Sequence, residues 1–70
     1  MREYVAIKTV RENGLLLPSA ILFRNQHYPI SEILRSSFFQ GETTFIIRIG
    51  KQVTHLYRDD FANRWFVVAA

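Results

Sequence analysis

Apolar residues recur along the chain in short runs with a period of two, and turn-forming residues separate the runs. In the clearest run, residues 43–49, Phe45, Ile47 and Ile49 share one face and Ile46 and Arg48 share the other. This alternation, together with many β-branched residues, is typical of strands. By the same criteria, strands are expected at residues 3–10, 15–23, 43–49, 52–58 and 64–70.

Turn signals stand between these runs. Asn13-Gly14 is the strongest, because both residues tolerate the positive φ that a two-residue hairpin turn requires. Asn25 is predicted to adopt positive φ in a second tight turn, and Gln40-Gly41-Glu42 and Gly50-Lys51 mark two more. Their even spacing predicts hairpins between antiparallel strands.

Two places are less regular. Pro18 has no N–H to give to a ladder, so it predicts a sheet edge, a bulge or the start of pairing. Residues 28–36 fit either a bulged strand or a short helical turn that begins at Ser31. We prefer the bulged strand, because Pro29 and the serines at positions 36 and 37 disfavour a helix.

These elements predict a single all-β domain spanning residues 1–70. We expect an antiparallel meander of five or six short strands that forms a small open barrel or a strongly twisted sheet.

The size of the chain suggests self-association. A domain of 70 residues buries only about 60% of the surface that its unfolded chain exposes. No cysteine is present to add a disulfide, and 49% of the residues are hydrophobic, so some apolar surface should stay exposed. We expect a homodimer formed through a free strand edge, either the segment around Pro18 or residues 65–70.

Nine basic and six acidic residues give a net charge of +3, which modestly favours anionic partners. The basic residues are scattered, so ordinary solubilising charge is the simpler interpretation. No apolar run approaches the roughly 18 residues of a membrane span, and the N-terminal residues lack the apolar core of a signal peptide. We expect a soluble cytoplasmic protein without a membrane partner.

Asp59 and Asp60 are the only adjacent carboxylates, and they suggest either a metal or acid/base site or a turn. His27 and His55 lie in other segments without metal-ligand spacing, whereas aspartates at a bend accept backbone N–H groups. We interpret residues 59–63 as a turn, with Phe61 packed on the core and Asn63 left-handed. With no phosphate-binding loop and no strained nucleophile turn, we expect no enzymatic activity, cofactor or metal.

Single-stranded nucleic acid is the other partner that the sequence suggests. Small β-barrels bind it by stacking bases on exposed aromatic residues between basic side chains. This requires the candidates to share one face, and aromatic residues in a protein of this size more often belong to the core. The candidates are Arg48, Lys51, Tyr57, Arg58, Arg64 and Trp65.

Two stretches resemble a family of small uncharacterised bacterial β-rich domains. "AILFRNQHYPISEIL" is similar to the family's Phe, short basic turn and Tyr-x-Ile pattern, and "LYRDDFANRW" to its Leu-Tyr-Arg-Asp strand end, turn and Arg-Trp pair. The resemblance covers residues 20–67. It departs at Arg24, where the family tends to have Trp, and at Asn63, where it tends to have Gly.

The resemblance implies that residues 56–65 form a structural hairpin. It implies no catalytic residues, and it suggests a DNA-repair context, because some members are associated with genes for translesion DNA polymerases. We therefore expect a non-enzymatic interaction module that self-associates, or alternatively an accessory nucleic-acid-binding protein.

Overall fold

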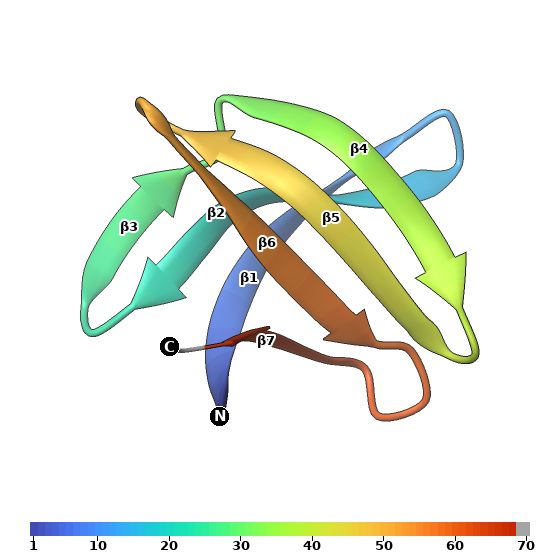
Figure 1. Cartoon of the computed structure of the whole chain (residues 1–70). Helices are drawn as coiled ribbons and strands as arrows, with labels where there is room; N and C mark the ends of the chain where they lie inside the picture. Colours follow the sequence, from blue (N-terminus) through green and yellow to red (C-terminus); the bar gives the residue numbers. More distant parts are fainter. Residues whose placement is uncertain (69–70) are drawn as a thin grey trace.

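Seven antiparallel strands form one sheet in the computed structural model, which describes residues 1–68. The sheet curls strongly into an open half-barrel, which confirms the all-β class and the open barrel shape (Figure 1). The strands are β1 (Arg2–Glu12), β2 (Leu15–Phe23), β3 (Gln26–Pro29), β4 (Glu32–Phe39), β5 (Glu42–Ile49), β6 (Gln52–Asp59) and β7 (Arg64–Val68). The last predicted strand reached residue 70, and residues 69–70 lie outside the described part.

The sheet has seven strands instead of five or six because the predicted segment of residues 28–36 is divided between two strands. Ile30 and Ser31 separate β3 from β4. The amide of Ile30 donates to the carbonyl of Ser19, whereas the amide of Ser31 donates to that of Arg48, both at 2.9 Å. The chain thus crosses from the β2 side of the sheet to the β5 side within two residues.

Residues 32–36 form a strand, and a bulge lies between Ile33 and Arg35, where the register against β5 shifts. The bulged strand is therefore confirmed for residues 32–36 and the helical alternative is wrong, but residues 28–36 are divided between two strands instead of forming one. Pro18 also lies at a bulge, because Lys8 faces Ala20 while Thr9 faces Pro18, which leaves Ser19 unmatched. The Ser19 hydroxyl compensates by donating to the carbonyl of Lys8 at 3.0 Å.

The strand order is β3-β2-β1-β7-β6-β5-β4. The meander is therefore made of two parts, β1-β2-β3 and β4-β5-β6-β7, which join where β1 pairs with β7. β3 and β4 follow each other in the sequence but form the two edges of the sheet. Arg2 is paired with Val68, so the start of β1 and the described end of β7 lie side by side at the β1-β7 seam (Figure 1).

The turns have the backbone conformations that the sequence predicts. Asn13 and Gly14 have φ angles of 51° and 80°, Asn25 of 62° and Asn63 of 54°. Each hairpin except the longer β6-β7 connection is therefore tight, and consecutive strands on either side of it pair in register.

The core fills the concave side of the half-barrel, which we call the inner face. Its buried residues come from β2, β5, β6 and β7 and are Ile21, Phe45, Ile47, Leu56 and Trp65. Because side chains alternate along a strand, the intervening residues of these strands lie on the convex outer face. None of the described residues belongs to a helix that is long and apolar enough to cross a membrane.

Candidate functional site

The two adjacent aspartates have separate structural roles at the β6-β7 turn. Asp59 Oδ1 accepts hydrogen bonds from the amides of Phe61 and Ala62, both at 3.1 Å. These amides have no partner in a neighbouring strand at the bend, so the carboxylate accepts the hydrogen bonds that a strand carbonyl would otherwise accept. The turn interpretation of Asp59 is confirmed.

Asp60 instead fastens the turn to the sheet. Its Oδ2 accepts a hydrogen bond from Thr43 Oγ1 at 2.8 Å, and its Oδ1 pairs with Arg58 Nη1 at 2.6 Å. Arg58 Nη2 also donates to Asn63 Oδ1 at 2.7 Å, so one guanidinium links both ends of the turn. This half-buried network stabilises the connection and leaves no carboxylate oxygen of Asp60 without a partner.

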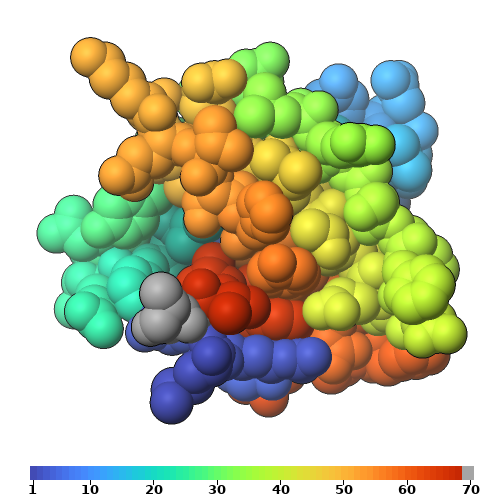
Figure 2. Space-filling view, in the orientation of Figure 1, coloured from blue at the N-terminus to red at the C-terminus, as the bar shows by residue number. Residues whose placement is uncertain are grey.

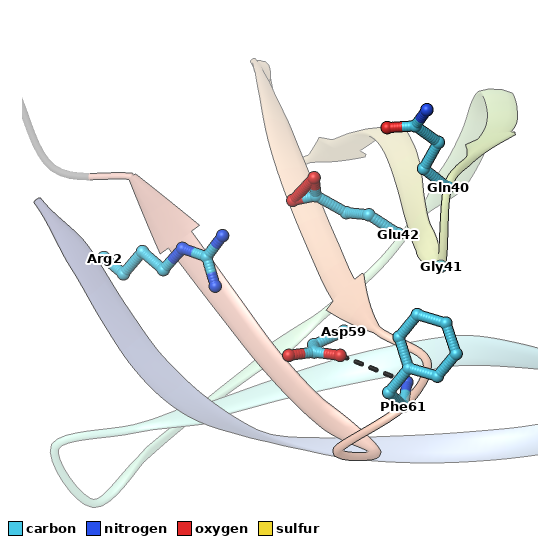
Figure 3. A pocket seen from close by; sticks show the side chains of 6 residues that line it. All are labelled: Arg2, Gln40, Gly41, Glu42, Asp59 and Phe61. Atoms are coloured by element: carbon cyan, nitrogen blue, oxygen red, sulfur yellow. Dashed lines mark hydrogen bonds between the residues drawn. The ribbon is translucent and has the colours of Figure 1, made fainter.

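Phe61 does not pack on the core as expected, since 89% of its surface is exposed. Its ring lies over Gly41, where a Cβ atom would come within 2.0 Å of the ring. Phe61 forms one wall of a shallow pocket, into which the carboxylates of Asp59 and Glu42 and the guanidinium of Arg2 project (Figure 3). The opposite charges there favour neither an anion nor a cation.

The histidines do not join the aspartates. His27 lies on β3 and His55 on β6, each exposed. Across residues 1–68, no three His, Cys, Asp or Glu side chains converge in a way that would hold a metal ion.

The six candidates for nucleic-acid binding are divided between two faces. Arg58 and Trp65 face each other across β6 and β7 on the inner face. Trp65 is only 9% exposed, and the Arg58 guanidinium, 5.8 Å from its ring centre, is held by Asp60 and Asn63. These two residues belong to the architecture, so the condition of one shared face is not met by Arg58 and Trp65.

Tyr57 and Arg64 lie on the outer face. Tyr57 is opposite Phe66 in the β6-β7 register, and Arg64 is opposite Asp59. Arg48 is on the outer side of β5, where its Nε lies 3.4 Å from Glu32 Oε1, and Lys51 is exposed in the β5-β6 turn. The structure thus places Tyr57 and Arg64 near each other and Arg48 and Lys51 farther along the sheet.

Around Tyr57 the outer face carries a row of rings that crosses three strands. The ring centre of Tyr57 is 5.2 Å from that of Phe66 with the planes stacked at 13°, and His55 and Tyr4 meet these rings edge-on at 6.4 and 5.9 Å. Arg2 lies 4.2 Å above Phe66, and Arg64 lies 3.6 Å above Tyr4. We call this set the aromatic–arginine surface: Arg2, Tyr4, His55, Tyr57, Arg64 and Phe66.

Sequence reasoning missed Arg2 and Tyr4. They alternate with Glu3 and Val5, which does mark them as sharing a face of β1. Their place beside Tyr57 and Arg64 depends on the pairing of β1 with β7, and no local pattern signals this pairing.

A second unusual feature is the edge strand β4. From Leu34 to Phe39 all of its residues are exposed, including Leu34 at 40%, Phe38 at 67% and Phe39 at 73%. β5 pairs with one side of β4, and the sheet ends at the other side.

The edges expected from the sequence were different. The C-terminal segment is not an edge, since β7 lies between β1 and β6 in the middle of the sheet. The segment around Pro18 does have a free side, because β3 covers only Ala20–Phe23 of β2. Its bulge and the missing N–H of Pro18 make it a poor template for another strand.

Comparison with protein-family models, with curated proteins and with solved structures finds no match to the chain.

Proposed function

We propose that this protein is a non-enzymatic interaction module that self-associates through β4. The observation that carries the proposal is the long, exposed and unpaired edge of β4 with three large apolar side chains, Leu34, Phe38 and Phe39. An edge of this kind offers a row of free backbone groups to another strand.

The two edges of the sheet differ in a way that supports this role. β3 has only four residues and ends at Pro29, which are two common means of preventing strand addition. β4 has eight residues and contains neither proline nor lysine, and its half from Ser36 to Phe39 carries no charge. Among residues 1–68, the β4 edge is thus the one best suited to a partner strand.

A second copy of the same chain is the partner that fits β4 best. Antiparallel pairing of two identical strands generates a two-fold interface, in which each surface meets itself. Leu34 lies in the bulge of β4, so the regular part of the edge is Arg35–Phe39. A pairing centred on Phe38 sets this residue opposite Phe38 of the second copy and Ser37 opposite Phe39. Apolar side chains then meet across the seam without placing like charges opposite each other.

Association would also stabilise a small domain. Each large apolar side chain that becomes fully buried contributes about 1.5–3 kcal/mol. The chain has no cysteine for a disulfide, so contacts between copies are a natural source of added stability.

The test is sedimentation equilibrium of the wild-type protein and of Phe38→Lys, which places a charge on the free edge. We expect a wild-type dimer that persists in high salt, because its interface is apolar, and a folded monomer for Phe38→Lys. Phe61→Lys is the control, since Phe61 is an even more exposed phenylalanine that lies in a turn, and it should remain dimeric.

A monomeric wild-type protein at concentrations of about 1 mM, which corresponds to about 4 kcal/mol of binding free energy, would rule the proposal out. A Phe38→Lys variant that stays dimeric would do the same for the β4 interface. Leu34→Lys gives a second, independent probe of the same edge if Phe38→Lys fails to fold.

A further inference from the structure

We infer that the aromatic–arginine surface binds single-stranded nucleic acid by base stacking and phosphate contacts. This function goes beyond self-association and does not depend on it, because β5 separates β4 from the strands that carry this surface. Figure 2 shows β1 in blue, β7 in red and β6 in orange meeting on one face of the molecule.

The composition of this face is unusual for its position. The outer side of an antiparallel sheet usually carries polar residues, since the opposite side already supplies the core. Here a second apolar cluster occurs, and Phe66 is only 1% exposed because Tyr4, Tyr57 and Arg2 cover it. The rings are thereby held in place, while Tyr4 remains 44% exposed and His55 is exposed as well.

A preformed aromatic row is the kind of platform on which bases stack. Every base has a π-face, so stacking on Tyr57 and His55 requires no particular sequence. A hollow of about 290 Å³ lies on the same face beside this row and provides space for a base next to Tyr57. It is lined by Val53, Thr54, His55, Tyr57 and Val68.

The two arginines supply the charge that a phosphate backbone requires. Among residues 1–68 the ion pairs involve Arg24, Arg48 and Arg58, whereas Arg2 and Arg64 contact rings instead of carboxylates. A guanidinium positioned over a ring still has N–H groups that can donate to phosphate oxygens. Arg2 and Arg64 therefore flank the stacked rings with charge that no ion pair among residues 1–68 holds, although Arg2 shares a pocket with the carboxylates of Asp59 and Glu42.

The acidic residues nearby define the direction of the bound strand. Asp59 faces Arg64 across the β6-β7 ladder, and Glu42 faces Asp59 across β5 and β6, so both carboxylates lie at the turn end of the surface. Phosphates are therefore expected to contact Arg64 on the side of Tyr4, away from these carboxylates. A single strand is expected to pass from Arg64 and Tyr4 over Tyr57 towards His55, with Lys51 farther along the same direction.

The test is fluorescence anisotropy with labelled oligothymidylate of about 12 nucleotides, within the usual site size of such surfaces. We expect binding at about 50 mM salt that weakens steeply by about 200 mM. Tyr57→Ala should weaken binding about tenfold through loss of a stacked base, and Tyr57→Phe, which keeps the ring, should bind as the wild-type protein does.

The charge contribution has a matched control. Arg64→Gln should weaken binding and reduce the salt dependence by about 0.7 in logarithmic slope, the release expected for one phosphate contact. Arg24→Gln removes the same charge from the β2-β3 turn, where Arg24 pairs with Glu3 on the face of β1 opposite to Arg2 and Tyr4, and should change binding little.

Three results would overturn the inference. The first is no binding at low salt, and the second is equal weakening by Arg64→Gln and Arg24→Gln. The third is competition by polyglutamate as strong as that by unlabelled oligothymidylate, which would reveal a general preference for anions without base stacking. Circular dichroism of each variant establishes that the fold is retained, and Arg64→Gln tests the surface if Tyr57→Ala does not fold.

Discussion

The conformations of single residues at the turns are the part of the structure that the sequence predicts most directly. Asn13, Asn25 and Asn63 have the positive φ that their chemistry predicts, and Asp59 accepts the amides of the bend as expected. These conformations depend on the residue and its immediate neighbours, so a local pattern is sufficient to predict them. The position of Phe61 is different, because it depends on Gly41 in another hairpin.

Gly14→Ala and Gly41→Ala separate the backbone contribution at these turns from the side-chain contribution. Both glycines have a φ of 80°, and only Gly41 has a ring within contact distance. Each substitution should lower the free energy of unfolding by about 1–2 kcal/mol for the left-handed backbone. Gly41→Ala should cost about 0.5–1.5 kcal/mol more, as Phe61 is forced from its position.

Urea denaturation of both variants measures the difference. Adding Phe61→Ala to Gly41→Ala should remove the extra cost, since the ring is then gone. Equal stability of the two single variants would show that Phe61 makes no stabilising contact with Gly41.

At the level of the strand, the sequence showed which residues alternate between the two faces of the sheet. It did not always show which of the two faces is buried. On β5, residues 45, 47 and 49 were expected on one face, and they face the core. On β7, Trp65 and Phe66 are both buried although they point to opposite faces, because Phe66 is covered by the aromatic–arginine surface. Such a strand has no exposed side to mark its outer face, so the sequence did not reveal that Trp65 and Tyr57 lie on opposite faces.

β6 offers a direct test of the assigned faces. Leu56 is fully buried on the inner face, whereas Val53, on the outer face, is 52% exposed. Leu56→Ala should lower the free energy of unfolding by about 2–5 kcal/mol through lost burial and a residual cavity. Val53→Ala on the same strand should change it by less than about 1 kcal/mol, and comparable losses for the two variants in urea denaturation would contradict the assignment.

For the whole molecule, the decisive contact is the seam between the strands that are farthest apart in sequence. Arg2–Val5 of β1 pair with Trp65–Val68 of β7, and this ladder unites the two parts of the meander. Hairpin signals predict pairing between neighbours in the sequence, but they contain no information about which outer strands meet. The sequence therefore predicted the all-β class and most hairpins, and missed the strand order and the residues that the seam assembles.

The seam predicts that the chain tolerates new ends at an exposed turn. A circular permutant that joins the original ends through a flexible linker and opens between Asn13 and Gly14 keeps every ladder, since those residues form a hairpin tip. We expect it to retain a β-sheet circular dichroism spectrum and cooperative thermal unfolding. A permutant opened between Leu56 and Tyr57, inside β6, should not fold, and a folded protein in that case would contradict the assigned topology.

The position of Arg2 opposite Val68 also affects how binding experiments should be done. A purification tag fused to either end would emerge beside Tyr4 and Tyr57, and a polyhistidine tag would add imidazoles of its own to that neighbourhood. Oligonucleotide binding by tagged material would then report partly on the tag, so cleaved protein is the appropriate sample for every measurement on this face.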